Sequence, residues 1–476
     1  MSERTKITLL TALPCIQASG TKYALVAVFV ACSAFGGWAT IGSLQKTGLG
    51  ALIEAVLAGN RAAFPGGPEP FKRHWTGLAP VDGLLSGIVG FFSAIIDGSN
   101  APDRSGKVEW DAYLFYVWFA AQFIAVWAML LLESLRVGNR GRLVSYVGLV
   151  GMLFQVGTWT VVGPLYLALH LLTSPVASLN RGDGPRARRA LFVLLWDMAL
   201  LPAVVTLTNT LPAVIMSAPA SGGVFLGGGL TASASAHYKA IAFWQFFPLW
   251  SVCLQAFLNP LCAFLFGSLL PVDSAGKPAP LGRGYLTGVS GVYQFALTVC
   301  VGVHAPLVAV SLAPAAARAW LAAHATSLYI PAAYAGLFET ASFRGIFVPA
   351  SPWTPPTIAV GAVNGGTIAY TGVAQAVAHF LRYDMLVGAV PFLLWAAYLH
   401  QTTAKQPLSP AALVRKVVFW SVVGGAYAPA VALLWGRDQV VLEEDEPLRV
   451  AAAVRAVAAG GGGGGTTTTT TTKKAQ

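Results

Sequence analysis

Three ionisable residues open one of the most apolar stretches of the chain, "AHFLRYDMLVGAVPFLLWAAYL" at residues 378–399. His379, Arg382 and Asp384 lie there within six positions of one another. An ionisable side chain inside a membrane-length apolar run costs free energy, so it indicates a functional site. A carboxyl group in such surroundings loses its hydration, which disfavours its charged form. It can therefore keep its proton near neutral pH and act as a general acid.

Further ionisable residues lie in other apolar runs. Glu133 ends "FIAVWAMLLLESLR", and Arg136 follows one helical turn later, a spacing that lets the two side chains pair. Asp197 lies in the middle of "ALFVLLWDMALLP", and His170 lies late in "GPLYLALHLLTSP". Residues near the ends of such runs can instead extend to the membrane surface. That alternative stays open for Asp384 and is weaker for Asp197 and His170.

Aromatic side chains accompany these groups. The ring faces of Tyr166 and Trp244 could stabilise a positive charge that develops on a substrate. Aromatic residues in membrane spans more often anchor a helix at the interface, so that alternative also stands. No HExxH, GxSxG or Walker A motif occurs, and neither the DDxxD nor the DxDD motif of soluble terpene enzymes is present. A magnesium-dependent enzyme that acts on a diphosphate is therefore disfavoured.

The elements that must position these residues are membrane helices. The chain has 476 residues, of which 55% are hydrophobic and only 10% are charged, whereas soluble domains carry about a quarter charged residues. Several continuous apolar runs reach the roughly 20 residues that a helix needs to cross a bilayer. The sequence therefore predicts an all-α, polytopic integral membrane helical bundle with about eight to ten transmembrane helices.

Composition divides the chain into three parts. An N-terminal segment at 1–22 precedes a predicted transmembrane catalytic domain at 23–435. Within that domain, residues 45–110 are predicted to form an interfacial loop or re-entrant region, because the apolar part of 81–99 is short. Residues 436–476 carry an acidic cluster and a Gly/Thr-rich end that cannot bury a core, so a disordered tail is expected.

Apolar runs predict the spans along the chain. They lie at about 23–44, 112–132, 143–171, 190–214, 240–268, 286–312, 318–338, 384–401 and 412–435, with 357–378 in doubt. Basic loops flank 143–171 on both sides, and the positive-inside rule cannot place both on one side if this segment crosses once. Either the segment is a hairpin or re-entrant pair, or one loop breaks the rule. Because Lys and Arg gather in such loops, the net charge of +11 predicts no nucleic-acid partner.

Five motifs follow one another over residues 23–435: "DGLLSGIVGFFSAIIDGS", "LLESLRVGNRG", "GPLYLALHLLTSP", "FWQFFPLW" and "FLRYDMLVG". In this order and spacing they resemble the fungal membrane-bound terpene cyclases of the ascofuranone type. That family includes the membrane epoxide hydrolases of aurovertin- and citreoviridin-type pathways. The resemblance implies acid-initiated opening of an epoxide on a lipophilic substrate, with no metal or organic cofactor. Internal alkene or hydroxyl groups would trap the cation in a cyclase, and water or a neighbouring hydroxyl group would do so in a hydrolase.

The resemblance also implies a setting. The expected partners are an epoxidised terpenoid or polyene substrate, membrane lipid and an upstream epoxidase of the same fungal secondary-metabolite pathway. The expected location is the membrane of the endoplasmic reticulum. A transporter or exporter of a lipophilic pathway product is the alternative, although no internal repeat of the transporter kind is visible.

Site residues follow from the motifs and from the buried charges. The candidate catalytic residues are Asp384, Glu133, His170, Asp97, Asp82 and Asp197, and the candidate substrate-binding residues are Gln245, Trp244, Tyr166, Arg382 and Arg136. Under the resemblance, Asp384 or Glu133 donates the proton, and His170 or Gln245 orients a nucleophile. Asp197 belongs to no matched motif and ranks lower.

Arg382 leaves the choice of acid open. If its guanidinium pairs with Asp384, the charged carboxylate is favoured and becomes a poor proton donor. Asp384 would then stabilise the cation, and Glu133 would supply the proton. The direction in which Arg382 points therefore decides between the two acids.

Overall fold

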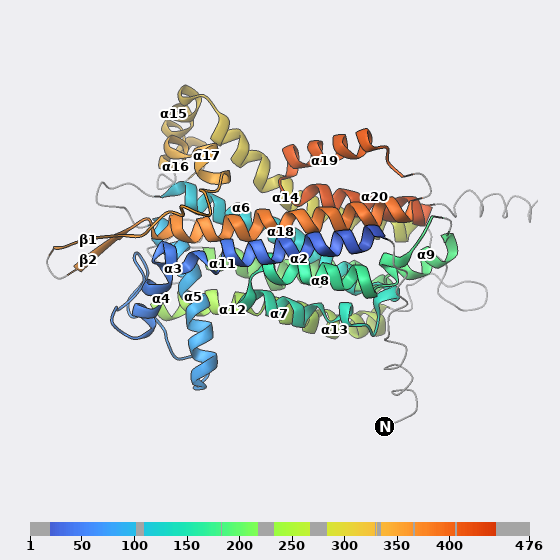
Figure 1. Cartoon of the computed structure of the whole chain (residues 1–476), viewed down its shortest axis with the longest axis horizontal. Helices are drawn as coiled ribbons and strands as arrows, with labels where there is room; N and C mark the ends of the chain where they lie inside the picture. The colour runs from blue at the N-terminus through green and yellow to red at the C-terminus, as the bar shows by residue number, and fades with distance from the viewer. Residues whose placement is uncertain are drawn as a thin grey trace, which may run out of the picture.

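The computed structural model describes residues 20–100, 109–181, 183–217, 233–266, 283–328, 330, 335–364, 367–404 and 407–443. Over these ranges the chain is almost entirely helical, and the helices run mostly side by side along the long axis of the molecule (Figure 1). Such long apolar helices can satisfy every backbone hydrogen bond internally, as a bilayer requires. The protein is a polytopic helical membrane protein, as predicted.

Seven helical segments of the described chain are long and apolar enough to cross a membrane. They are Gly20–Thr47, Ala79–Ser99, Trp110–Ser134, Leu195–Ser217, Phe247–Phe266, Leu286–Leu312 and Val373–Thr403. They correspond to α2 (Gly20–Ala39) with α3 (Ser43–Thr47), α5 (Ala79–Asn100), α6 (Trp110–Ser134), α10 (Leu195–Val205) with a π-helical turn and α11 (Leu211–Ser217), α13 (Phe247–Phe266), α14 (Arg283–Leu312) and α18 (Val373–Thr403). This number is below the predicted eight to ten, because some predicted spans fold as shorter pieces.

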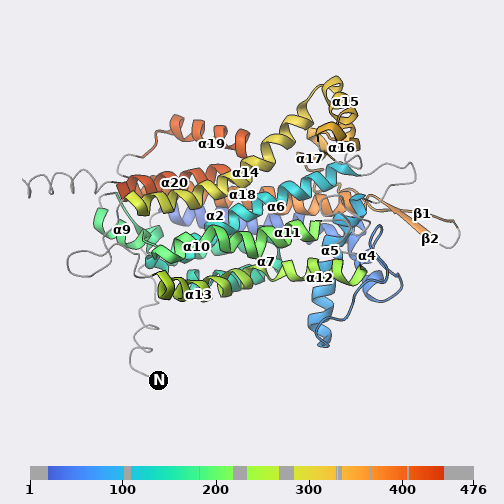
Figure 2. The same ribbon diagram turned by 180° about the vertical axis from the view of Figure 1, so that it is seen from behind.

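Helix α6 forms the centre of the bundle. Nearly all of its residues are buried, and it packs against α10, α14 and α18. Figure 2 shows α10, α13 and α14 from behind, with α6 running among the helices of the bundle. A helix that is apolar on every face is expected at such a position.

The predicted span 143–171 folds as two short helices, α7 (Val147–Gly157) and α8 (Trp159–Thr173). Between them Thr158 has a positive φ of 68°, which breaks the helix. The two helices pack against each other, and the hydroxyl of Tyr166 on α8 donates to the carbonyl of Val144, just before α7, at 2.8 Å. The segment is therefore a hairpin that enters the bundle and returns to the same end, which removes the conflict with the positive-inside rule.

A second hairpin forms where one span was predicted at 412–435. It consists of α19 (Pro410–Gly424) and α20 (Ala428–Glu443), with a break at Gly425, whose φ is +87°. Its tip meets the tip of the first hairpin, since the indole of Trp159 donates to the hydroxyl of Tyr427 at 2.7 Å. Because α20 continues to Glu443, the predicted boundary at 435 falls inside a helix of the bundle; residues 444–476 and 1–19 lie outside the described residues.

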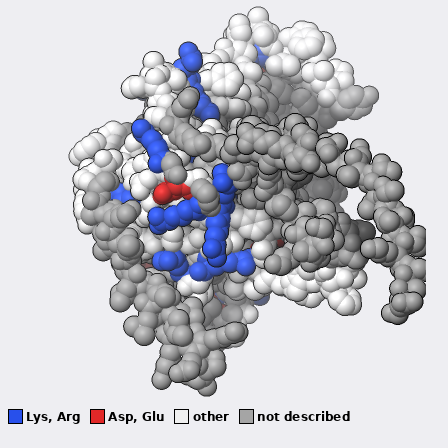
Figure 3. Space-filling view, turned by 90° about the vertical axis from the view of Figure 1, so that its right-hand side faces the viewer, with Lys and Arg blue, Asp and Glu red and all other residues white. Residues whose placement is uncertain are grey.

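Basic residues gather at the end of the bundle where both hairpins begin and end. This basic end comprises Lys22, Arg140, Arg142, Arg181, Arg415, Lys416 and the arginines of α9 (Gly184–Leu191). Figure 3 looks onto it, and Lys and Arg dominate the coloured side chains there.

The opposite end carries shorter elements. They are α4 (Leu49–Leu57), α12 (Ala234–Gln245), α15 (Ala315–Ala323), α16 (Ala335–Thr340), α17 (Phe343–Phe347) and an antiparallel hairpin of β1 (Ala359–Asn364) and β2 (Thr367–Thr371). The predicted span 318–338 thus contains two short helices instead of one long one, and 357–378 begins with the β-hairpin. Helix α5 runs crosswise to the long axis of the bundle (Figure 1). A place for 45–110 at the membrane interface stays a prediction.

Candidate active site

A cavity of about 380 Å³ lies between α5, α6, α7, α8, α12 and α18. This volume is typical of small-molecule sites, which span roughly 300–1,000 Å³. Aromatic rings dominate its walls: Phe91, Phe92, Phe119, Phe123, Phe154, Trp159, Trp244 and Phe380. Asp384 is the only charged side chain among the described residues that line it.

Asp384 is held in place by the N-terminus of α8. Its Oδ1 accepts a hydrogen bond of 2.8 Å from the backbone N–H of Thr160, and the side chain is only 5% exposed. Within the described part of the chain, Asp384 forms no ion pair with a Lys, Arg or His. This hydrogen bond orients the carboxyl group at the cavity wall, and no neighbouring cation of the described chain favours its charged form.

Arg382 does not pair with Asp384. Its guanidinium donates to the backbone carbonyls of Gly345 and Ile346, the latter at 3.0 Å, and lies over the ring of Phe115 at 5.1 Å. Successive positions on a helix point in different directions, so two residues that are two positions apart do not face each other. Arg382 therefore ties α18 to α17, and the condition under which Glu133 would replace Asp384 as acid is not met.

The meeting of the two hairpin tips places the start of α8 at the cavity. The hydroxyl of Tyr427, which accepts from Trp159, donates to the carbonyl of Met385 at 2.8 Å. The backbone N–H of Tyr427 donates to Gln122 on α6 at 3.1 Å. These bonds join α6, α8, α18 and α20 within two turns of Asp384, so the carboxyl group lies on a rigid frame.

Aromatic rings pack edge to face around the cavity. Phe123 on α6 contacts Phe154 and Trp159 with ring centroids 5.4 and 6.0 Å apart, and Phe92 contacts Trp244 at 5.2 Å. Such rings present partial negative charge on their faces, which attracts a cation. Sequence reasoning found Trp244 but missed the phenylalanines of α5 and α6, because they lie in runs whose apolar character already explained them as spans.

The cavity opens to the outside of the bundle through apolar residues. Of the residues lining it, Ile41, Leu84 and Val156 are 47%, 48% and 54% exposed. They belong to the connection after α2, to α5 and to α7, three elements that flank one side of the cavity. A mouth of this composition faces lipid more readily than water.

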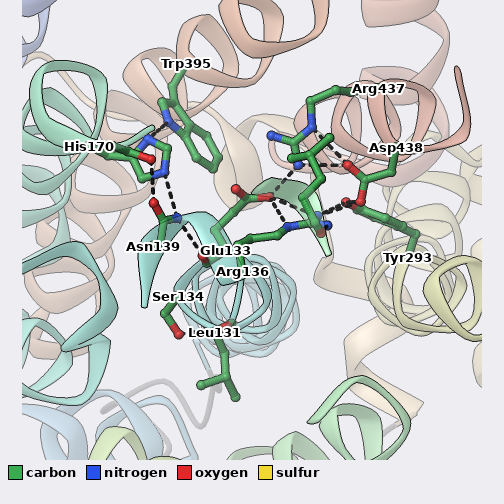
Figure 4. A network of polar contacts seen from close by, with 12 residues as sticks. Leu131, Glu133, Ser134, Arg136, Asn139, His170, Tyr293, Trp395, Arg437 and Asp438 are labelled. Atoms are coloured by element: carbon green, nitrogen blue, oxygen red, sulfur yellow. Dashed lines mark hydrogen bonds and ion pairs between the residues drawn. The ribbon is translucent and has the colours of Figure 1, made fainter. Parts of the chain in front are cut away.

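Glu133 lies in a different environment near the basic end (Figure 4). Its Oε1 accepts hydrogen bonds from Arg136 at 3.1 Å and from Arg437 at 2.6 Å. Arg136 also reaches Asp438 at 2.5 Å, and Tyr293 donates to Asp438 at 2.8 Å. Two carboxylates and two guanidinium groups thus balance one another in a cluster whose four charged side chains are at most 1% exposed.

His170 belongs to the surroundings of this cluster. It accepts a hydrogen bond of 3.1 Å from the indole of Trp395, and Asn139 lies 3.5 Å from its other ring nitrogen (Figure 4). Asn139 also donates to the backbone carbonyl of Glu133 at 2.8 Å. None of these residues lines the cavity that contains Asp384.

The other candidate acids have local partners. Asp82 accepts the backbone N–H groups of Thr76 and Gly77 at 2.7 and 3.2 Å, which fixes the chain entering α5. Asp97 lies 3.0 Å from the ring of His237. Asp197 forms an ion pair of 2.9 Å with Arg140 near the basic end. Such roles are typical of acids that hold elements together.

Of the remaining candidates for substrate binding, one lines the cavity and the others bond to residues elsewhere in the fold. Trp244 lines the cavity, and its indole donates to Asn209 at 2.9 Å. Tyr166 holds the first hairpin closed, as described above, and Arg136 belongs to the Glu133 cluster. Gln245 donates to the carbonyl of Ile241 within its own helix at 3.2 Å. Of all residues chosen from the sequence, the structure brings Asp384 and Trp244 together at the cavity.

Comparisons with known proteins find a matching family model and similar fungal proteins. Residues 24–442 match the model of the CtvD domain. A protein named terpene cyclase ascI, from Acremonium egyptiacum, is 24% identical over 418 residues, which cover 86% of this chain and 90% of that protein. A protein named terpene cyclase ctvD, from Aspergillus terreus (strain NIH 2624 / FGSC A1156), is 25% identical over 376 residues, or 79% and 88% of the two chains. No solved structure matches the chain.

Proposed function

Because the chain belongs to the CtvD domain family, we propose that it is a membrane-embedded terpene cyclase whose Asp384 opens an epoxide by protonation. The observation that carries the proposal is a single buried carboxyl group, free of cationic partners in the described chain, at the wall of an aromatic cavity. The substrate class is an epoxidised terpenoid or polyene. Such a molecule is lipophilic and requires an epoxidase upstream in a fungal secondary-metabolite pathway.

The chemistry begins with proton transfer from the Asp384 carboxyl group to the epoxide oxygen. The C–O bond to the more substituted carbon breaks, the oxygen stays on the substrate as a hydroxyl group, and the carbon becomes cationic. An internal alkene then donates its π electrons to this carbon and closes a ring. Loss of a proton from the final cation returns that proton to the Asp384 carboxylate, so the product is an isomer of the substrate and the acid is regenerated.

The cavity walls support each stage. Phe123, Trp159 and Trp244 offer ring faces to a cation that moves along the substrate, and each such contact is worth about 0.5–2 kcal/mol. The apolar surface leaves little room for hydrogen-bonded water, which would trap the cation early. Gln155 and Thr158 are the uncharged polar residues among the described lining.

Access to the cavity suits a substrate dissolved in the bilayer. The exposed residues Ile41, Leu84 and Val156 form an apolar mouth, so the substrate can enter without crossing water. The proposal places the enzyme in the endoplasmic reticulum membrane. There an epoxidase can deliver its product directly into the lipid.

The test is conversion by the full chain in purified membranes, without added metal or nucleotide. The substrates are the terminal epoxide of a farnesylated phenol and an epoxidised conjugated polyene, and mass spectrometry identifies the products. A cyclised isomer of either substrate supports the proposal. Addition of water would make the protein an epoxide hydrolase, and movement of unchanged substrate across sealed vesicles would make it an exporter; either result overturns cyclisation.

A further inference from the structure

Both hairpins of the bundle break at a residue whose backbone lies in a region that is almost reserved for glycine. Gly425 has φ +87° and ψ −160° after α19, whereas Thr158 has φ 68° and ψ 151° between α7 and α8. A Cβ atom crowds the backbone in this region, so the conformation costs free energy for residues other than glycine. Among the described residues, Thr158 is the one non-glycine residue with a positive φ. Glycine would make the same turn without this cost, so the turn alone does not explain the threonine.

The side chain of Thr158 lies at the acid of the proposed active site. Thr158 and Asp384 both line the aromatic cavity, and the N–H of Thr160, two residues further on, donates to Oδ1 of Asp384 at 2.8 Å. The Thr158 hydroxyl lies beside the same carboxyl group. Its oxygen is buried and has no well-aligned hydrogen bond to a described residue. A buried hydroxyl in this state is unfavourable, so both the backbone and the side chain of Thr158 cost stability in the resting protein.

Proton transfer changes the hydrogen bonding that Asp384 requires. Oδ1 already accepts the N–H of Thr160, so the proton of the neutral carboxyl group belongs on Oδ2. When this proton moves to an epoxide oxygen, negative charge spreads over both oxygens and Oδ2 becomes an acceptor. A neighbouring hydroxyl can rotate and donate to it. Catalytic hydrogen bonds are often poorly aligned before the reaction and tighten as charge develops.

We propose that Thr158 is a positioning residue for the acid, and that its hydroxyl donates to the Asp384 carboxylate as the proton leaves. The inference rests on the proposed function, in which Asp384 opens the epoxide. Thr158 keeps its own proton throughout, and only the carboxyl proton moves to the epoxide oxygen. A hydrogen bond that forms with the developing charge stabilises the transition state and not the bound substrate. It therefore raises kcat without lowering KM.

The first experiment measures epoxide consumption by the full chain in purified membranes. Valine has the shape and the β-branching of threonine but no hydroxyl, so in Thr158→Val kcat should fall about 10- to 100-fold with KM nearly unchanged. Thr158→Ser restores the hydroxyl and should recover most of the loss. Thr173→Val is the control, because its hydroxyl bonds to Leu169 within α8 away from the cavity. A wild-type kcat in Thr158→Val, or equal losses in Thr158→Val and Thr158→Ser, would overturn the proposal.

Thr158→Gly separates the hydroxyl from the turn. Glycine adopts this backbone conformation without strain, and the relief should exceed the entropy that glycine adds to the unfolded chain. The thermal midpoint in detergent should therefore rise by a few degrees, while kcat falls as in Thr158→Val. A variant that is more stable and fully active would overturn the proposal. A lower midpoint would also overturn it, because packing would then account for the threonine.

Infrared difference spectroscopy tests the contact without turnover. The carboxyl band of Asp384 is identified by its loss in Asp384→Asn. It should shift in Thr158→Val and stay in place in Thr173→Val, and an unchanged band in Thr158→Val would overturn the proposal. If the wild type consumes no epoxide, the proposed function fails, while a shifted band still supports the contact of Thr158 with the acid. If the wild type consumes epoxide and Thr158→Val is equally fast, only the role of Thr158 fails.

Discussion

Glu133 and Asp384 are both buried acids on membrane helices, yet their surroundings differ in almost every respect. Glu133 lies among Arg136, Arg437 and Asp438 in a cluster without net charge (Figure 4). Asp384 accepts a hydrogen bond from the backbone N–H of Thr160 and faces a cavity. Burial alone would make both residues equal candidates, so the partners decide what each carboxyl group can do.

The Glu133 cluster stabilises the place where several chain segments meet. Arg437 comes from α20, Tyr293 from α14, and Arg136 donates to the carbonyl of Leu191 at the end of α9. A carboxylate that is bound by two guanidinium groups stays charged and cannot give up a proton that it does not carry. Asp384 has no such cation in the described chain, which is why the proposed function assigns the proton transfer to it.

The largest effect should follow from removing the acid at the cavity. In Asp384→Asn, the amide oxygen can still accept the N–H of Thr160, so the fold should be kept while the transferable proton is lost. We expect the cyclisation rate to fall by about 10²- to 10⁴-fold. The measurement is the rate of product formation per folded protein. Asp183→Asn, at a partly exposed acid near the basic end, serves as control and should leave the rate unchanged; equal activity of both variants would remove Asp384 from the mechanism.

The next effect should appear in stability. Glu133→Gln leaves two buried guanidinium groups with one carboxylate, and breaking a buried ion pair costs about 3–5 kcal/mol. The thermal midpoint in detergent should fall accordingly, while the rate per folded molecule stays near that of the wild type. The double variant Glu133→Gln with Arg437→Gln restores the charge balance and should recover part of the loss. A stable Glu133→Gln protein with no activity would instead identify Glu133 as the proton donor.

These two acids also show which features of the fold and of the candidate site could be predicted from the sequence alone. The apolar runs predicted a polytopic helical bundle, because the length and composition of a run decide whether it can span a bilayer. Both acids could be chosen as candidates, since a charge in such a run is costly. The sequence could not decide between the two acids as proton donor. The partners of Glu133, Arg437 and Asp438, lie about 300 residues away in a segment that composition assigned to the tail.

The two hairpins differ in how far the sequence predicted them, because the basic loops on both sides of 143–171 left a hairpin open there, whereas 412–435 was predicted as one span. A break at one residue, Thr158, turns a continuous apolar stretch into two helices that return to the same end, and Gly425 does the same for α19 and α20. Hydropathy averages over about 20 residues and does not register such a break. The contact between Trp159 and Tyr427, which joins the hairpin tips beside Asp384, depends on both breaks and so could not be predicted.

A smaller effect tests the aromatic walls of the cavity that contains Asp384. Phe123→Leu keeps the volume approximately but removes a ring face near Trp159, and the loss of one cation–π contact should lower the rate about tenfold. The variant should also release products of early proton loss, which gas chromatography would detect. Phe257→Leu, on a side chain that is 64% exposed on α13, is the matched control. If both variants give the wild-type rate and products, the rings only fill space.

The smallest effect concerns the opening of the Asp384 cavity, whereas the charged side chains of the Glu133 cluster are at most 1% exposed. Leu84→Trp narrows the apolar mouth without touching Asp384, so substrate should enter more slowly while the chemical step is unchanged. We expect kcat/KM to fall about fivefold, a difference on the order of 1 kcal/mol, with little change in kcat. Leu149→Trp places the same large side chain on an exposed position of α7 that does not line the cavity, and it should have no effect. An equal fall of kcat/KM in both variants would point to a general change in the membrane around the protein. A fall in kcat for Leu84→Trp alone would mean that this residue contacts the reacting part of the substrate.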